Sequence, residues 1–375
     1  MRIRPTRATL HGRLRARLLR RARAPLALVA VGVLGLAGGL QAAKPSGSKC
    51  PPRNPHCQTT STSTSTTTTA TTTTSSPTPG PLTWAPPAGW QNYTDLAPIV
   101  GNGGQFNLSN STDYRLVGYN GGGLRLNGGR NIVIMGSVFT VGTAWLPGGD
   151  NCGLCIGSNG TSVSGRVVHV EGSKFTGPLL GDGIQIFDGN AIVQLENDHD
   201  VLSHGADGGV HADIVQPWGG ERELRIDGFT GYTTCQGGNW KRDLGSPAYN
   251  GPIYLRRTNF RDTANLCGYL SWVSTPKNTN LFTDGTNGFW IQQGPGRTFQ
   301  HSIWPDETSS TPPLVQSDAA GTFATYPNLN GVDGTQMWRT WTGGANGQIR
   351  QGVPPGGDFV PAASVGIGYV TPGYR

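Results

Sequence analysis

The sequence predicts an all-β fold in which the chain winds into stacked coils of parallel strands. From Trp84 onward the chain is rich in Gly and Pro and has few stretches with helical spacing of apolar residues. Short runs of alternating apolar residues recur instead, bounded by Gly, Asn and Asp, as is typical of short strands. These runs repeat at a period near 30 residues, which indicates one coil of chain per repeat.

A first series of runs has a short strand, a small or polar corner and then usually an aromatic residue. One apolar position aligns across the series, with separations of 36, 25, 31 and 29 residues. A coil that advances by one strand spacing, about 4.8 Å, stacks equivalent strands, so we expect these positions to form one buried apolar column. The runs are Asn131–Phe139, Val167–Phe175, Ile192–Asp200, Glu223–Phe229 and Pro252–Phe260, and the aligned residues are Ile134, Val170, Leu195, Ile226 and Leu255.

A second series of short strands interleaves with the first at the same period. Two interleaved series predict at least two strands in each coil. An antiparallel sandwich or jelly roll is the alternative fold, and it explains the strands but not their period. The runs of the second series are Asp182–Asp188, Asp213–Pro217, Gly268–Ser274 and Gly288–Gln293.

This repeat pattern, over Asn120–Trp304, resembles that of the pectate-lyase-like superfamily. The resemblance implies a right-handed parallel β-helix with irregular N- and C-terminal caps. We expect the β-helix domain to span residues 83–312, with Thr83–Phe106 as one cap. Residues 313–375 are Gly/Pro-rich and are expected to form a strap along the coil or a cap at its end. Because the match is to a repeat and not to an invariant motif, it indicates fold more than chemistry.

The first 43 residues have the pattern of an export signal. Met1–Ala24 holds nine arginines and no acidic residue, Pro25–Leu40 is apolar, and Ala42-Ala43 provides small residues for cleavage. A membrane anchor is the alternative, but the apolar stretch is shorter than the roughly 20 residues of a spanning helix. Removal of these arginines takes the formal charge from +7 to −2, so no basic footprint for nucleic acid remains. We therefore expect a secreted or cell-surface protein.

Residues 44–82 contain two cysteines followed by a Ser/Thr/Pro-rich stretch, which predicts a linker or stalk. Six cysteines in an exported chain favour disulfides over metal or redox chemistry. Cys235 and Cys267 are 32 residues apart and would lie in neighbouring coils. The spacing predicts three local pairs, which are Cys50 with Cys57, Cys152 with Cys155, and Cys235 with Cys267.

The densest group of ionisable residues includes a repeated motif. Asp182-Gly-Ile-Gln185 recurs 31 residues later as Asp213-Ile-Val-Gln216. One coil of offset would place Asp182 beside Asp213, where two carboxylates can act as an acid and base pair because each raises the other's proton affinity. A spacing of one to two coils is near the lower part of the about 6.5–9.5 Å range of inverting glycosidases. Alternatively, the aspartates satisfy turn amides and the glutamines form an amide ladder.

Other residues near this motif are further candidates. On a strand, His211 and Asp213 would share one face and form a catalytic pair; alternatively, His211 is a hydrogen-bonded turn residue. Trp218 and Trp240 flank the acidic group and could stack on sugar rings, although buried coils and caps also use tryptophan.

The resemblance implies two alternative chemistries for this group. Polygalacturonase-like hydrolases use clustered aspartates with a histidine and an Arg/Lys pair, but their Asn-Thr-Asp, Asp-Asp and Arg-Ile-Lys strings are absent here. Lyases neutralise a uronate carboxylate, often with calcium, and remove the adjacent proton. The residues that match the hydrolases are Asp182, Asp207, Asp213, His211 and Lys241; a lyase would use Lys241, Arg242 or His211 as base and Asp182, Asp207 and Asp213 as oxygen ligands for calcium.

Two hypotheses for function follow, and both have a polysaccharide as the partner. The first is a secreted polysaccharide lyase or glycosidase that acts on an extracellular, possibly uronate-containing polysaccharide. The second is a non-catalytic surface or adhesion module that binds glycans. An enzyme needs its carboxylates to converge in a cleft, whereas a scaffold spreads them over a solvated face. The predicted catalytic residues are Asp182, His211, Asp213 and Lys241, the substrate-binding residues are Gln185, Gln216, Trp218, Trp240 and Arg242, and the metal ligand is Asp207.

Overall fold

The computed structural model consists mostly of β-strands. Its helical segments, among the residues described, are the short helix α1 (Ala97–Val100) and the 3-10 helices η1 (Trp90–Asn92) and η4 (Ala362–Ser364). No helix in this part of the chain is long and apolar enough to cross a membrane. The structure describes residues 80–143, 151–160, 163–205, 210–240, 251–264, 266–267, 271–274, 281–284, 288–292, 299–304, 314–318, 338–340 and 349–375.

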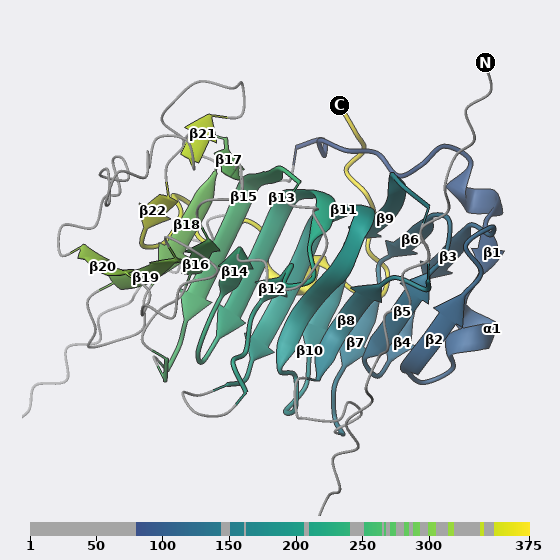
Figure 1. Cartoon of the computed structure of the whole chain (residues 1–375), viewed down its shortest axis with the longest axis horizontal. Coiled ribbons are helices and arrows are strands. Elements are labelled where there is room, and N and C mark those ends of the chain that lie inside the picture. The colour runs from purple at the N-terminus through teal and green to yellow at the C-terminus, as the bar shows by residue number, and fades with distance from the viewer. Residues whose placement is uncertain are drawn as a thin grey trace, which may run out of the picture. The chain divides into compact units, whose positions relative to one another are not determined.

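The strands form a curled sheet in which successive coils of the chain pair in parallel (Figure 1). Each coil contributes to up to three stacks of strands, and β11 (Asp182–Ser203) runs through all three. The first stack contains β2 (Gly104–Leu108), β5 (Leu124–Gly128), β8 (Cys152–Gly157), the start of β11, β12 (Val215–Gln216), β14 (Gly238–Trp240), β16 (Ser271–Ser274) and β19 (Phe299–Trp304). β20 (Leu314–Asp318) pairs with β19 in antiparallel orientation.

The second and third stacks are joined by a sharp corner in each coil. The long strands β13 (Glu221–Thr233) and β15 (Ile253–Asp262) pass through this corner from one stack to the next. The second stack also contains β1 (Thr94–Asp95), β3 (Tyr114–Val117), β6 (Ile132–Met135), β9 (Arg166–Glu171), β17 (Leu281–Thr283) and β21 (Trp338–Thr340), and the third contains β4 (Asn120–Gly121), β7 (Val138–Thr140), β10 (Lys174–Thr176), β18 (Phe289–Gln292) and β22 (Ile349–Gln351).

The predicted apolar column is confirmed residue by residue in the second stack. Each aligned residue pairs in register with the equivalent residue of the next coil. All five side chains are fully buried in the main hydrophobic cluster. Burial of each such side chain stabilises the fold by about 1.5–3 kcal/mol, so this column is a principal source of stability. Its members are Ile134, Val170, Leu195, Ile226 and Leu255.

The assignment of one strand in the second sequence series was wrong. Gly288–Gln293 was expected to stack with Gly268–Ser274, but β18 pairs instead with the end of β15 in the third stack. The first stack continues from β16 to β19. Strands of different stacks recur at the same period, so the period alone cannot tell which stack a run joins.

The corner between the second and third stacks requires a left-handed backbone conformation. Gly172, Asn197 and Gly228 occupy equivalent positions in successive coils, with φ values of 63°, 53° and 84°. Glycine and asparagine tolerate this region best. Arg257 follows in the next coil with φ 45°, a strained value for its side chain, and its Nε donates a 2.7 Å hydrogen bond to Asp227 Oδ1.

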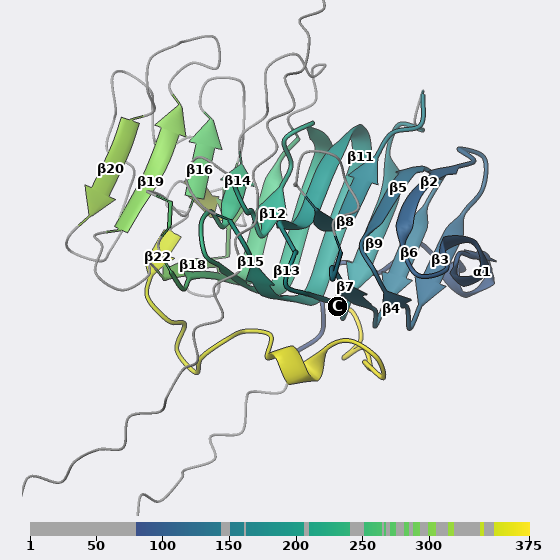
Figure 2. The ribbon, with the colours of Figure 1, turned by 90° about the horizontal axis from the view of Figure 1, so that it is seen from below.

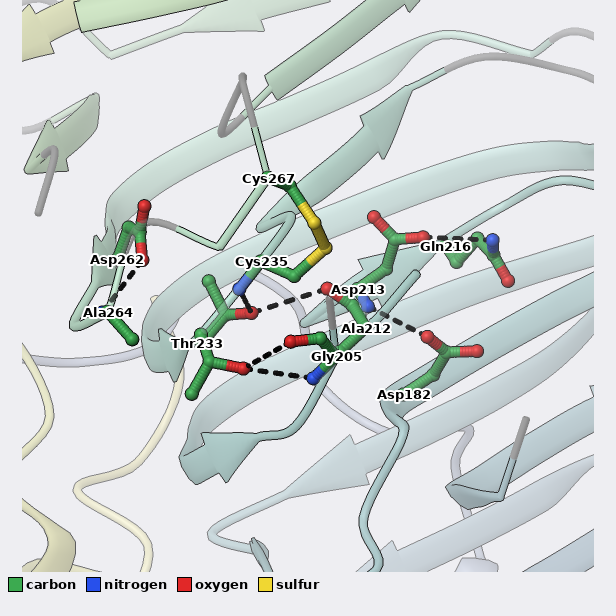
Figure 3. Close-up of a disulfide and its surroundings, with 11 residues drawn as sticks. Asp182, Gly205, Ala212, Asp213, Gln216, Thr233, Cys235, Asp262, Ala264 and Cys267 are labelled. Atoms are coloured by element: carbon green, nitrogen blue, oxygen red, sulfur yellow. Dashed lines mark hydrogen bonds between the residues drawn. A yellow bond between two sulfur atoms is a disulfide. The ribbon is translucent and has the colours of Figure 1, made fainter. Parts of the chain in front are cut away.

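Two of the three predicted disulfides are confirmed. Cys235 bonds Cys267, with 4.6 Å between their Cα atoms, and joins the turns that follow β13 and β15 in neighbouring coils (Figure 3). Cys152 bonds Cys155 within β8. The third predicted pair, Cys50 with Cys57, lies outside the described residues, as do the predicted export signal and almost all of the linker.

The C-terminal residues run back along the outside of the sheet. In Figure 2 this yellow segment passes beneath the second and third stacks after β22. Val360 N donates a 3.0 Å hydrogen bond to Thr230 Oγ1 in the third stack, and Gly366 N donates to the carbonyl of Gly172 at 2.7 Å. Residues 358–375 therefore form a strap over outward-facing side chains.

Candidate functional site

The repeated Asp-x-x-Gln motif lies on adjacent coils of the first stack. Gln185 pairs in register with Gln216, as predicted. In each motif the glutamine Nε2 donates a hydrogen bond to the aspartate of the same motif, at 2.9 Å from Gln216 to Asp213 Oδ2 and also from Gln185 to Asp182. The two motifs therefore repeat one local arrangement, one coil apart.

Both aspartates are buried, with 1% of Asp182 and none of Asp213 exposed to solvent. The main-chain amide of Asp213 donates a 2.7 Å hydrogen bond to Asp182 Oδ1 (Figure 3). The amide of Gly183 donates to the Asp213 carbonyl at 2.9 Å. These bonds join the entry of one coil to the next. The arrangement has the features of the turn-forming alternative, in which the aspartates satisfy turn amides.

The structure does not bring His211 onto the face of Asp213. The expectation that they share a face assumed a strand at these residues, but β12 begins only at Val215. His211 is exposed whereas Asp213 is buried. Three other candidates, Lys241, Arg242 and Asp207, lie outside the described residues, so their positions relative to the aspartates stay predictions.

The two candidate tryptophans have different environments. Trp240 lies inside the coil with 1% of its surface exposed, stacked on Phe260 at 6.0 Å between ring centroids. Trp218 is half-buried on the outside of the first stack and stacks on Phe187, with centroids 5.7 Å apart and planes 26° apart. Only Trp218 thus presents a ring where a ligand could approach.

The outer face of the first stack carries three side chains that contact one another in succession, which we call the aromatic platform: Arg125, Phe187 and Trp218. The Arg125 guanidinium carbon lies 5.0 Å from the centroid of the Phe187 ring, and Phe187 in turn stacks on Trp218. All three side chains are half-buried. The platform spans four strand positions of the stack, from β5 past β8 and β11 to the turn after β12.

Two glycines make room for Phe187. Phe187 pairs in register with Gly157 in the preceding coil. A Cβ atom added at Gly157 would lie 2.2 Å from Phe187 Cε2, and one at Gly219 would lie 2.3 Å from Phe187 Cβ. Real Cβ atoms do not approach so closely, so Gly157 leaves room for the ring, and Gly219 lets the turn after β12 approach the main chain of Phe187.

Arg125 is a cation with no carboxylate partner among the described residues. Its Nη2 lies 3.8 Å from Cys155 Sγ, and its buried Nε has no hydrogen-bond partner. Burial lowers the pKa of this guanidinium, although arginine remains charged at neutral pH. A half-buried cation that lacks a counterion is suited to bind an anionic group of a ligand.

Amide side chains surround the platform. Gln216 is half-exposed and follows Arg125, Cys155 and Gln185 in one outward-facing row. In the next row, Asn127 Nδ2 donates a 3.0 Å hydrogen bond to the exposed Asn107. Aromatic faces pack against the apolar side of a sugar ring while amides exchange hydrogen bonds with its hydroxyl groups. This face therefore combines aromatic rings with amide groups that can donate and accept hydrogen bonds.

Sequence reasoning identified Gln185, Gln216 and Trp218 but missed Arg125 and Phe187. Two signals could have found them. Phe187 lies two residues after Gln185, so on a strand both side chains share one face. Arg125 precedes Cys155 by 30 residues and Gln185 by 60, which places it in the same row at the period of the coil.

No group of three or more His, Cys, Asp or Glu side chains within the described ranges is arranged to hold a metal ion. Asp207, the predicted calcium ligand, is outside those ranges, so a calcium requirement stays a prediction. Comparisons with protein-family models, with curated proteins and with solved structures find no match to this chain. Functional roles must therefore be argued from the geometry of the site.

Proposed function

We propose that this chain is an extracellular protein that binds polysaccharide on the outer face of its first stack. The observation that carries the proposal is the aromatic platform, in which a guanidinium and two aromatic rings contact one another in succession with amides beside them. A pattern typical of an export signal and two disulfides support a location outside the cell.

We further propose that the coils form a right-handed parallel β-helix, as the resemblance to pectate-lyase-like proteins implies. Successive parallel strands of one stack are joined by crossovers that contain the strands of the other stacks. Crossover connections between parallel strands are right-handed in about 98% of cases.

The platform favours an acidic polysaccharide over a neutral one. Arg125 has no carboxylate partner in the described part of the chain, so a uronate carboxylate could pair with it without displacing an internal counterion. Charge-assisted hydrogen bonds contribute about 1.5–3 kcal/mol, which corresponds to about tenfold or more in affinity.

Binding measurements with two probes test this proposal. The wild type should bind polygalacturonate more tightly than a neutral glucan, and added salt should narrow the difference. Trp218→Ala should weaken both interactions by about tenfold through loss of ring stacking. Arg125→Gln should weaken binding of polygalacturonate by about tenfold and change glucan binding little.

Arg225→Gln is a matched control, because Arg225 also stacks on a tryptophan, Trp84 at 5.7 Å, but on the second stack. This variant should bind both probes as the wild type does. The proposal is wrong if the wild type binds neither probe, or if Arg125→Gln and Trp218→Ala bind as well as Arg225→Gln.

Catalysis by a lyase or a glycosidase is a second candidate function. The observation that favours it is the pair of carboxylates on adjacent coils, each hydrogen-bonded to a glutamine of the outward-facing row. A screen of acidic and neutral polysaccharides, with and without calcium, should follow new reducing ends and the ultraviolet absorbance of unsaturated uronates. If the aspartates transfer protons, Asp213→Asn should fold normally and lower turnover by about a hundredfold. Normal turnover in that variant would leave binding as the function.

A further inference from the structure

A row of carboxylates on the outer face of the second stack is completely buried. Glu171 pairs in register with Glu196 of the next coil, and Glu196 pairs with Asp227 of the coil after that. None of the three residues is exposed. Burial of several carboxylates is costly unless each finds partners, so the contacts that cover this row determine its behaviour.

The end of the strap covers this row through two tyrosines. Tyr369 Oη donates a 2.9 Å hydrogen bond to Glu171 Oε1, and Tyr374 Oη donates to the other oxygen of the same carboxylate. Asn197 Nδ2 donates to Tyr369 Oη at 3.1 Å. Both hydroxyl groups thus converge on Glu171, and we call residues Gly366–Arg375 the tail.

The tail also binds the segment through which the chain enters the sheet. Leu82 N donates to the Gly373 carbonyl at 2.8 Å, and Arg375 N donates to the Leu82 carbonyl at 3.0 Å. Thr83 Oγ1 donates to Asp227 Oδ2 at 2.5 Å, and Trp84 N donates to Glu196 Oε1 at 3.2 Å. The two ends of the described chain therefore cover the carboxylate row together.

The beginning of the strap has a separate anchor that does not involve Glu171. Asp358 accepts hydrogen bonds from Tyr232 Oη and, at 3.0 Å, from Asn259 Nδ2. His199 Nδ1 lies 2.6 Å from the Val360 carbonyl. Release of the tail would therefore leave the strap attached at this upstream point.

We propose that Glu171 is an acid-sensitive latch for the tail, which docks when the carboxylate is ionised and lifts away when it takes up a proton. A protonated carboxyl group has only one good acceptor oxygen and no charge to strengthen the hydrogen bonds from Tyr369 and Tyr374. Lifting the tail would uncover Glu196 and free Leu82, next to the predicted linker.

Four other ionisable groups besides Tyr374 face Glu171. On its own strand, His169 Nε2 lies 3.0 Å from Glu171 Oε2. The next coil contributes two carboxyl groups, and the tail contributes its tyrosines. Burial raises the pKa of Glu196 to about 10, so this carboxyl group is protonated at neutral pH, and burial also raises the pKa of Asp198 well above its ordinary value. The four are His169, Glu196, Asp198 and Tyr369.

Of the three carboxyl groups Glu171, Glu196 and Asp198, Glu171 is the one whose pKa is lowered, so it is ionised at neutral pH. Burial raises the pKa of Glu171, but hydrogen bonds from His169 and Tyr374 more than offset this effect and leave it below its ordinary value. A depressed pKa stabilises the docked state at neutral pH, and this contribution is lost as pH falls through the folded-state pKa. The latch should therefore open below pH about 4. At the alkaline end, ionisation of Glu196 near pH 10 would place a second charge beside Glu171 and weaken docking again.

Hydrogen exchange of the full exported chain, followed by mass spectrometry and expressed as protection factors, tests the latch. In the wild type, protection of the tail should fall at least tenfold between pH 6 and pH 3, while the buried centre of β11 stays protected. Glu171→Gln should leave the tail poorly protected at both pH values. The double variant Tyr369→Phe, Tyr374→Phe should do the same without altering the carboxylate.

Two further variants serve as controls. Glu196→Gln should keep the acid transition of the tail and lose the alkaline one. Asp358→Asn should loosen the upstream anchor and leave the acid transition of the tail unchanged. Equal protection of the wild-type tail at pH 3 and pH 6 would overturn the proposal, as would an acid transition that persists in Glu171→Gln or in the double tyrosine variant.

Discussion

The main-chain amide of Asp213 donates a 2.7 Å hydrogen bond to the carboxylate of Asp182, one coil earlier in the first stack. The second oxygen of Asp182 accepts a hydrogen bond from Gln185, and both residues are buried. The equivalent glutamine in the next coil, Gln216, is half-exposed. The same motif therefore has a dry copy and a partly solvated copy.

This difference predicts unequal costs for the same substitution. Asp182→Asn would set its amide group against the donor group of Gln185 in a dry site, and should lower the free energy of unfolding by about 1–3 kcal/mol. Asp213→Asn should cost less, because water can reach the Gln216 amide that loses its best partner. Urea unfolding of both variants measures the difference, and equal losses would contradict this interpretation of the motif.

Adjacent valines on β9 provide a test of the stacked core. Val168 is fully buried on the inner face of the second stack, paired in register with Ile132 and Val193, whereas its neighbour Val167 faces outward and is half-exposed. Val168→Ala should lower the free energy of unfolding by about 2 kcal/mol through lost burial and the cavity left behind. Val167→Ala, which removes the same atoms from the other face, should cost less than half as much in the same denaturant titration.

The register of the second stack could be predicted from sequence because each coil repeats one strong local signal. Ile134, Val170 and Leu195 each lie in a run of alternating apolar residues with a small or polar corner after it. Only one alignment of the runs places all of these aligned residues on the inner face, since a shift by one residue would turn their side chains to the outer face. Period and burial together therefore determined the stacking.

The same reasoning could not locate the contacts between segments that lack a repeat. Tyr374 and Glu171 are 203 residues apart, and nothing in the local sequence of either one indicates the other. Arg125 was missed for a related reason, because its importance comes from stacking on Phe187 in a later coil. His211 was misplaced because a two-residue step has meaning only on a strand, and no strand forms there.

The two described disulfides should differ in their contribution to stability. Cys235 and Cys267 close a loop of 32 residues, whereas Cys152 and Cys155 are separated by only three. In the chain-entropy model the longer loop stabilises by about 3–4 kcal/mol and the shorter one by about 2 kcal/mol. The double variant Cys235→Ala, Cys267→Ala should therefore have the lower unfolding midpoint of the two double alanine variants. The reverse order would show that local packing around β8 outweighs loop closure.

Asp200 occupies an inward-facing position of the third stack where neighbouring coils have phenylalanine or glycine. It pairs in register with Phe175 and Gly231 and is fully buried. Ser203 Oγ donates a 2.6 Å hydrogen bond to Oδ2, while Oδ1 has no hydrogen-bond partner. Burial, with a smaller contribution from Asp182, raises the pKa of Asp200 well above its ordinary value.

This carboxyl group should make the folded state less stable as pH rises. Above pH about 4 the unfolded chain releases the Asp200 proton, whereas the folded chain keeps it up to its own, raised pKa, so stability falls by up to about 1.4 kcal/mol per pH unit between these two pKa values. Asp200→Asn should flatten this slope between pH 5 and pH 8. Asp113 is the control, because its pKa is shifted in the opposite direction. Its hydrogen bond with Arg130 lowers the pKa and stabilises the fold above pH about 4. Asp113→Asn should therefore lower the free energy of unfolding at pH 7 and leave its slope against pH from pH 5 to pH 8 unchanged. If that slope is also unaltered in Asp200→Asn, Asp200 is ionised in the folded chain and this interpretation is wrong.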